Sequence, residues 1–224
     1  MKKQIGILVA VLATFVSRAE VSNLTTNASP NVTIPDANPV GVFSTITVSG
    51  MNTGWGISDL TVSLNISGGF NGDLYAYLLS PNNTMVVLLN RVGVSSSDAF
   101  GYGDAGFNIT LAAAGYNVHD YQNYSPSYSG GQLINTWAPD QRIIDPQSDP
   151  ADFDALPTGN NLSAYYGLDP NGVWSLFVAD VSGGNESTLV SWGLTVTVVP
   201  EPTTFALLGS GMATLWVLGR KRRK

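Results

Sequence analysis

Any acid–base chemistry in this sequence would have to begin at its only histidine, His119. A serine hydrolase would use this ring as its general base, with an acid such as the neighbouring Asp120 to orient it. The chain contains no Gly-x-Ser-x-Gly turn to expose a serine nucleophile. We therefore predict that His119 is a surface loop residue and that the protein has no catalytic residues.

Four aspartates, Asp145, Asp149, Asp152 and Asp154, follow one another closely. On paper they could supply the paired carboxylates of a glycoside hydrolase. Their proline-rich surroundings are more typical of a solvated loop. An Asp-based hydrolase is therefore the third choice among the functions that the sequence allows.

Calcium is a better use of the aspartates, because it takes hard oxygen ligands from loops. Asp98 and Asp104 flank a glycine-rich stretch in which backbone carbonyl groups could converge, although the stretch is not an EF-hand loop. Calcium at Asp98 and Asp104 is the one candidate cofactor that the sequence offers. The alternative is that both are solvated residues that end strands.

The stretch from residue 112 to residue 161 contains five prolines, several tyrosines and no clear strand pattern. It is too aromatic for a disordered linker, so we predict an ordered loop over one edge of the domain. Tyr121, Tyr124 and Trp137 are candidate contacts to an extracellular polysaccharide, because such rings stack on sugars. The alternative is that these rings only fasten the loop to the domain.

Composition excludes several classes of partner. Between residues 20 and 199 the only cations are Arg91 and Arg142, whereas all but one of the 16 acidic residues lie there. Such a body repels nucleic acid and anionic lipid. The absence of cysteine removes disulfides and thiolate chemistry, so an apolar core must stabilise the domain.

The elements that must position these residues are strands. Apolar residues alternate with polar ones, as in Leu60, Val62, Leu64 and Ile66, and no helical period is sustained. Turn residues 80–84 predict a hairpin between 74–79 and 85–89, and residues 180–185 predict a second hairpin. We expect Trp174 and Trp192 between two sheets. The pattern predicts an all-β jelly-roll sandwich of about eight antiparallel strands.

The body also resembles a known family, the P domain of proprotein convertases. The matching blocks, in the order of that family, are Ser44–Gly50, Ile57–Ile66, Gly72–Leu74, Leu79–Pro81, Asn171–Leu176 and Leu189–Leu194. The resemblance implies a jelly-roll β-sandwich over residues 31–199. In convertases this domain follows a protease. Here only a signal peptide and a short leader precede it, so we expect no protease activity.

The start of the chain has the layout of a secretory signal. Lys2 and Lys3 precede an apolar run over 5–16, and Ser17-Arg18-Ala19 forms a cleavage site, which predicts a signal peptide over residues 1–19. A short leader would occupy residues 20–30. We therefore expect the protein to be exported.

The end of the chain carries a second targeting signal. Val199, Pro200, Glu201 and Pro202 precede an apolar run over 205–219, and Arg220, Lys221, Arg222, Arg223 and Lys224 follow it. As a helix the run would reach about 22 Å, a marginal span of a hydrocarbon core of about 30 Å, and the cations should stop it on the cytoplasmic side. The order of these parts resembles the PEP-CTERM sorting signal of Gram-negative bacteria. An ordinary C-terminal anchor is the alternative.

The PEP-CTERM resemblance implies a membrane sorting enzyme of the exosortase type as partner, with transient association at the inner membrane. We expect the product at the cell surface or in the extracellular matrix. The function predicted from the whole sequence is a non-catalytic biofilm β-sandwich, and a carbohydrate-binding module is the alternative.

Overall fold

The computed structural model describes residues 20–200 and Gly211, and strands are the commonest element in this part of the chain. Strands account for 48% of the residues and helical turns for 11%, and the strands form two sheets. The predicted β-rich class is confirmed at this level. The predicted signal helix over residues 1–19 and the predicted apolar helix over 205–219 lie outside the described residues. Within those residues, no helix is both long enough and apolar enough to cross a bilayer.

The larger sheet has seven strands in the order β1-β11-β4-β7-β9-β8, with β2 pairing on β11. Its strands are β1 (Ser22–Ala28), β2 (Val32–Ile34), β4 (Trp55–Gly68), β7 (Gly106–Leu111), β8 (Tyr128–Ser129), β9 (Gln132–Trp137) and β11 (Ser187–Pro200).

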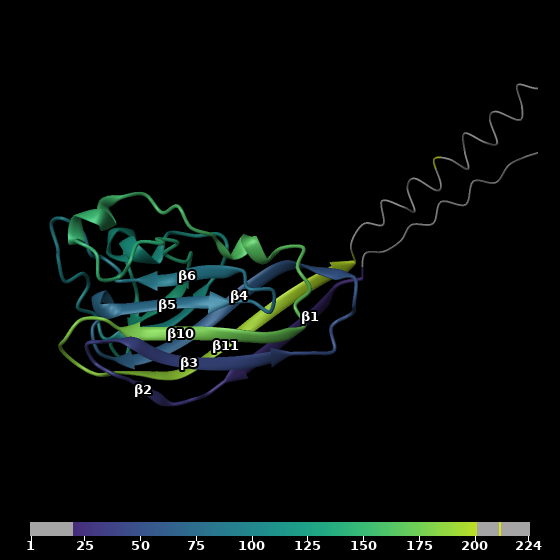
Figure 1. Cartoon of the computed structure of the whole chain (residues 1–224), viewed down its shortest axis with the longest axis horizontal. Helices are drawn as coiled ribbons and strands as arrows, with labels where there is room; N and C mark the ends of the chain where they lie inside the picture. Colours follow the sequence, from purple (N-terminus) through teal and green to yellow (C-terminus); the bar gives the residue numbers. More distant parts are fainter. Residues whose placement is uncertain (1–19, 201–210, 212–224) are drawn as a thin grey trace, which may run out of the picture.

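The smaller sheet has four strands in the order β3-β10-β5-β6. These are β3 (Asn38–Val48), β5 (Leu74–Leu79), β6 (Met85–Asn90) and β10 (Gly172–Asp180). Four 3-10 turns complete the description: η1 (Asn71–Asp73), η2 (Val118–Tyr124), η3 (Pro150–Asp154) and η4 (Leu162–Tyr165). In Figure 1 the smaller sheet runs across the view, and the long strands β4 and β11 pass it at an angle.

One cluster of buried side chains from both sheets forms the core. Along β4 the side chains of Leu60, Val62, Leu64 and Ile66 are buried and alternate with more exposed neighbours, as period-two alternation predicts. Trp174 of β10 and Trp192 of β11 are buried in the same cluster, which confirms their predicted place. Their ring N–H groups donate to the Pro170 carbonyl and the Ser44 hydroxyl, at 2.9 and 2.8 Å.

The predicted hairpin around residues 80–84 is confirmed, because β5 and β6 pair antiparallel. The second predicted hairpin is wrong. β10 belongs to the smaller sheet and β11 to the larger one, so the turn over 181–186 crosses between sheets. A glycine-rich turn reverses the chain in either case, and long-range pairing decides which sheet the next strand joins.

The number and direction of the strands also differ from the prediction. The described residues form eleven strands, not about eight, and β9 runs parallel to β7, with Phe107 opposite Leu133. The residues from 112 to 161, predicted to lack a clear strand, therefore supply β8 and β9 as well as η2 and η3. The same segment continues over the edge of β6, where the amides of Asp140 and Gln141 donate to the carbonyls of Leu88 and Val87.

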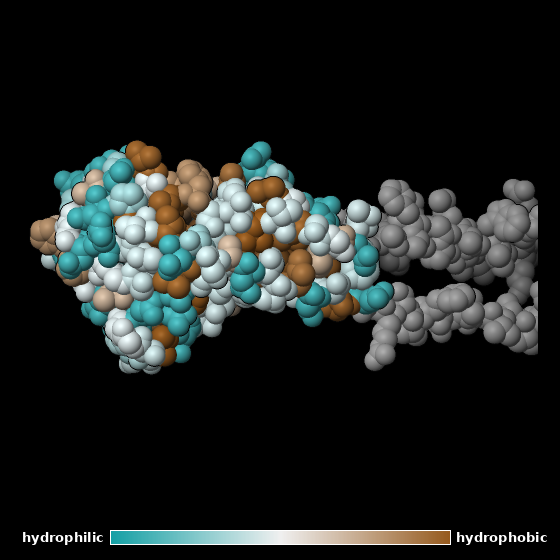
Figure 2. Space-filling model, turned by 90° about the horizontal axis from the view of Figure 1, so that it is seen from below, coloured by the Kyte–Doolittle hydropathy of each residue, from teal (hydrophilic) through white to brown (hydrophobic). Residues whose placement is uncertain are grey.

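Residues 22–28 form β1, paired with β11 from Ser22 opposite Val198 to Ala28 opposite Trp192. The predicted leader over 20–30 is therefore largely a strand of the sheet. The start of β1 and the end of β11 lie side by side at one end of the sandwich, as Figure 1 shows. Seen from below in Figure 2, the described surface mixes hydrophobic residues with hydrophilic ones.

Candidate functional site

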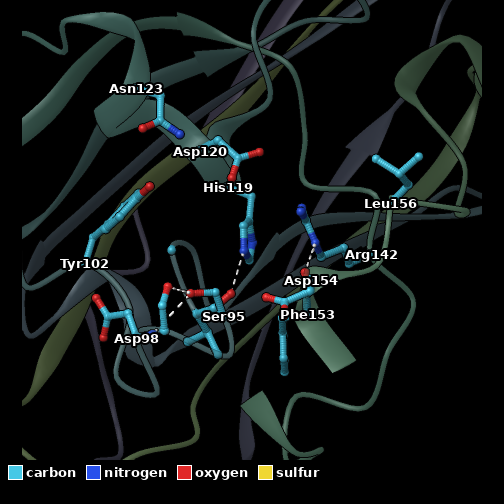
Figure 3. A pocket seen from close by; sticks show the side chains of 13 residues that line it. Ser95, Asp98, Tyr102, His119, Asp120, Asn123, Arg142, Phe153, Asp154 and Leu156 are labelled. Atoms are coloured by element: carbon cyan, nitrogen blue, oxygen red, sulfur yellow. Dashed lines mark hydrogen bonds between the residues drawn. The ribbon is translucent and has the colours of Figure 1, made fainter. Parts of the chain in front are cut away.

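A pocket of about 560 Å³ lies beside the loop that joins β6 to β7. The loop supplies Ser95, Asp98 and Tyr102, and η2 supplies His119 and Asp120. The segment after β9 supplies Arg142, Asp154 and Leu156. In Figure 3 the side chains of His119 and Arg142 lie near the centre, with Tyr102 and Asp98 on one side and Leu156 on the other.

His119, Asp140 and Arg142 form a buried polar cluster at the base of this pocket. Asp140 is fully buried, and its Oδ2 lies 2.8 Å from His119 Nδ1 while its Oδ1 accepts from Arg142 Nη1 at 3.1 Å. The backbone amide of Asn90 also donates to Asp140 Oδ2, at 3.0 Å. Both oxygens of this buried side chain therefore have hydrogen-bond partners, as buried polar groups usually do.

The local sequence positions His119 through the start of η2. The Asn117 side chain caps the turn by accepting from the His119 amide at 2.8 Å, and its own amide donates to the Asp140 carbonyl at 2.9 Å. His119 is 2% exposed, so the prediction of a surface histidine is wrong. Its acidic partner is Asp140, not the adjacent Asp120.

Both ring nitrogens of His119 face acceptors, because Nε2 lies 3.0 Å from the Val94 carbonyl. The ring therefore has no free lone pair directed at a nucleophile, and no described serine bonds to it. The nearby Ser95 hydroxyl pairs with that of Ser97 at 3.0 Å. The described residues thus do not assemble the proton transfer of a serine hydrolase.

Three of the four aspartates from 145 to 154 accept hydrogen bonds from backbone amides. Asp145 accepts from the Gln147 amide at 2.9 Å, and Asp149 accepts from the Ala151 amide at 3.0 Å at the start of η3. Asp154 accepts from the Ser96 amide at 3.0 Å. This bonding to Ser96 lowers the pKa of Asp154, which therefore stays ionised at the rim of the pocket.

The Asp104 side chain accepts hydrogen bonds from three side chains of the segment 112–161. Its Oδ2 accepts from the Tyr121 hydroxyl at 2.6 Å, from Gln122 Nε2 at 3.0 Å and from the Tyr128 hydroxyl at 3.1 Å. Burial, followed by the interaction with Asp104, raises the pKa of Tyr128 to about 12 and that of Tyr121 well above its usual range. Both phenols therefore remain neutral donors at physiological pH.

The predicted calcium ligands Asp98 and Asp104 are thus occupied by different protein donors. Asp98 Oδ1 accepts from the amides of Phe100 and Gly101, each at 3.1 Å. Within residues 20–200, no three acidic or imidazole side chains are grouped closely enough to hold a metal ion. The structure gives the prediction of calcium at Asp98 and Asp104 no support.

The proposed glycan contacts are largely corrected. Tyr121 and Trp137 are buried in the core cluster, so neither ring can stack on a sugar. Of the three, only Tyr124 is exposed, at 42%, and its ring stacks on that of Tyr116 with centroids 3.9 Å apart and planes 13° apart. Trp137 lies on β9 opposite Leu111, which places it in the sheet rather than on a loop.

Comparison with known protein families identifies a sorting signal at the end of the chain. A family described as "PEP-CTERM protein-sorting motif" matches residues 198–223. The match covers Val199, Pro200, Glu201 and Pro202 and most of the basic cluster that begins at Arg220. It implies export, with membrane-associated sorting and processing by an exosortase-type enzyme of Gram-negative bacteria. Of the four motif residues, the structure describes Val199 and Pro200, which lie at the end of β11.

The body gives weaker matches. No curated protein matches the chain. Among solved structures, the serine protease of Aeromonas sobria in complex with a chaperone matches with 16% identity and a TM-score of 0.42. The same species' protease without the chaperone matches with 15% identity and a TM-score of 0.41. Each match covers 80% of this chain but spans only 27% of the protease chain.

Proposed function

We propose that this protein is an exported, non-catalytic β-sandwich that the PEP-CTERM route delivers to the cell surface or the extracellular matrix. The observation that carries the proposal is the junction of the two parts. The sorting motif begins at Val198, while β11 remains paired to Pro200, which lies opposite Trp55. The sandwich and the signal are therefore contiguous, with no linker between them.

This junction suits a domain that is delivered as cargo. Processing close to Glu201 would remove the apolar tail and leave β11 whole in the sheet. The body has few cations and would not be retained by anionic lipid headgroups. A structural or adhesive role in a biofilm matrix follows from this combination of a stable sandwich and a surface address.

The resemblance to the P domain of convertases belongs to the same proposal. Its matching blocks fall on strands of both sheets, β3, β4, β5, β10 and β11. In that interpretation the chain uses the P-domain sandwich as a structural module. His119 then serves the packing of the segment over β6 rather than catalysis.

Mass spectrometry of the mature C-terminus tests the proposal. The full chain is expressed in a Gram-negative host with an exosortase and in the same host with the exosortase deleted. We expect a product ending near Glu201 in the first host and the intact Lys224 terminus in the second. Intact Lys224 in both hosts would contradict the proposal. A variant with Pro200→Ala, Glu201→Ala and Pro202→Ala should behave in the first host as the wild type does in the second.

A second candidate function is binding of extracellular polysaccharide, favoured by the exposed stacked pair Tyr116 and Tyr124. The pair displays aromatic surface to solvent, which can stack on a sugar ring. In a pull-down with matrix polysaccharide, a Tyr116→Ala and Tyr124→Ala double variant should lose binding. Tyr166→Ala, at another partly exposed tyrosine, is the matched control and should keep it.

A further inference from the structure

The pocket beside the loop between β6 and β7 contains a polar group that the buried cluster beneath it does not use. Arg142 lines the pocket and is 7% exposed. Its Nε donates to the Phe153 carbonyl and its Nη1 to Asp140 Oδ1, each at 3.1 Å, whereas its Nη2 has no hydrogen-bond partner in the described part of the chain. In Figure 3 the end of this side chain lies between His119 and Leu156. A fixed, unpaired donor at the wall of a pocket indicates a ligand that supplies an acceptor.

Three carboxylates line the same pocket, those of Asp98, Asp120 and Asp154. Asp98 and Asp154 each accept from backbone amides through Oδ1, which leaves their Oδ2 atoms free. The Asp120 side chain makes no hydrogen bond to another described residue. Both ion pairs among residues 20–200 involve Asp140, so no described cation is bonded to any of the three. The pocket therefore offers several free acceptors and one free donor.

The three carboxylates do not form a metal site. Within the described residues, no three acidic or imidazole side chains are grouped closely enough to hold an ion. The pocket has a volume of about 560 Å³, inside the range of about 300–1,000 Å³ that is usual for sites that bind small organic molecules. An organic ligand with several polar groups can reach acids that a single ion cannot bridge.

Apolar side chains complete the lining. Tyr102 contributes a partly exposed ring from the loop, and Leu156, which is 84% exposed, lies at the mouth of the pocket. Asn123 adds an exposed side-chain amide from η2, which can both donate and accept. Apolar walls with a few polar groups directed inwards are typical of ligand sites, and rings such as that of Tyr102 can stack on a sugar.

The charge of the pocket decides which kind of sugar fits. Arg142 is already paired with Asp140, so its positive charge is compensated. The charges of Asp98, Asp120 and Asp154 have no such partner. An acidic sugar would be repelled by these three groups, whereas a protonated amino group would be attracted to them. A hydroxyl group of the same sugar supplies the acceptor that Arg142 Nη2 lacks.

We propose that this pocket binds one unit of a cationic polysaccharide, a sugar that carries a free amino group. The ammonium group pairs with the three carboxylates, and the hydroxyl groups bond to Arg142 Nη2 and Asn123. Because Asn123 and Leu156 are exposed at the mouth, the bound unit can belong to a longer chain. This inference goes beyond delivery to the cell surface, and its site is separate from the stacked pair Tyr116 and Tyr124.

Isothermal titration calorimetry of the full chain in detergent, at pH 6 and low salt, tests the site with the disaccharide of glucosamine. We expect this probe to bind, and its N-acetylated form, which lacks the charge, to bind about tenfold more weakly. A disaccharide of uronic acid should not bind. Added salt should weaken the binding of the amino disaccharide, because mobile ions screen the charges.

Asp120→Asn is the variant that locates the site, because this side chain makes no hydrogen bond within the described chain. It should weaken binding of the amino disaccharide about tenfold. Asp152→Asn removes the same charge at an exposed position outside the pocket, and this matched control should keep the wild-type affinity. The Tyr116→Ala and Tyr124→Ala double variant should also keep it, which distinguishes this site from the stacked pair.

Four results would overturn the proposal. The first is no binding of the amino disaccharide to the wild type, and the second is equal affinity for its N-acetylated form. The third is unchanged affinity in Asp120→Asn. The fourth is an equal loss in Asp152→Asn, which would mean that the acidic surface attracts cations without a site. If Asp120→Asn fails to fold, Asp154→Asn replaces it, because asparagine keeps the oxygen that accepts from the Ser96 amide.

Discussion

His119 Nδ1 and Asp140 Oδ2 lie 2.8 Å apart in the interior of the protein, although 21 positions separate them in the sequence. This contact ties η2 to the segment that covers β6. With Arg142 on the other carboxylate oxygen, it makes Asp140 the centre of the cluster beneath the pocket.

Replacing Asp140 should therefore be strongly destabilising. Asp140→Ala leaves Arg142 and His119 buried without their anion, and such a loss typically costs about 3–5 kcal/mol. Urea unfolding followed by fluorescence measures it. Asp152→Ala, at an exposed aspartate of the same segment, should stay within about 0.5 kcal/mol of wild type. A cost below about 1 kcal/mol for Asp140→Ala would show that the cluster adds little.

Trp192 is the second position at which a single substitution should strongly lower the free energy of unfolding of the domain. Trp192→Ala opens a cavity between the sheets and leaves the Ser44 hydroxyl without its donor, so we expect a loss of about 3–5 kcal/mol. Differential scanning calorimetry would record a lower melting temperature. Leu156→Ala, at a side chain that is 84% exposed, is the control for an apolar truncation. A Trp192→Ala melt within a degree or two of wild type would refute the core assignment.

The phenol of Tyr128 should titrate near pH 12 instead of about 10, because burial and Asp104 disfavour its anion. A folded-state pKa above the unfolded value gives stability that is fully present below about pH 10 and is lost as the pH rises through about 12. The ¹³Cζ shift of Tyr128, assigned with Tyr128→Phe, follows the titration. Asp104→Asn should lower the pKa part of the way towards 10, since desolvation remains. An unchanged pKa would remove Asp104 as a cause.

The basic cluster should be needed for sorting, because its cations resist crossing the bilayer. Changing Arg220, Lys221, Arg222, Arg223 and Lys224 to glutamine should prevent processing in a host that contains the exosortase. Mass spectrometry would then recover the full-length C-terminus. Thr203→Ser, between the motif and the apolar run, should be processed normally. Normal processing of the glutamine variant would show that the motif alone suffices.

The alternation of residues such as Leu60 and Val62 made strands such as β4 predictable, because these strands have one buried face. Trp174 and Trp192 could be assigned to the core for the same reason, as large apolar residues on such faces. β1 was not predictable in this way. It is rich in asparagine and threonine and buries little apolar side chain, and its place in the sheet comes from pairing with β11.

The candidate site depended on contacts that no local pattern records. Asp140 reaches His119 although β8 and β9 lie between them in the sequence. Only Asn117, an N-cap two residues before His119, was a local signal for the turn that holds the ring. Burial of Trp137 likewise follows from the parallel pairing of β9 with β7, which a sequence window cannot reveal.

The position of β11 has a mechanical consequence. Over Ser187–Pro200 it pairs with β4 on one side and with β1 and β2 on the other, and its last residues enter the sorting motif. A pull on Pro200 acts along the strand, while the ladder bonds lie across it. These bonds are then loaded together in shear instead of opening one after another. A molecule held by this end against flowing water would bear tension on its most extensively paired strand.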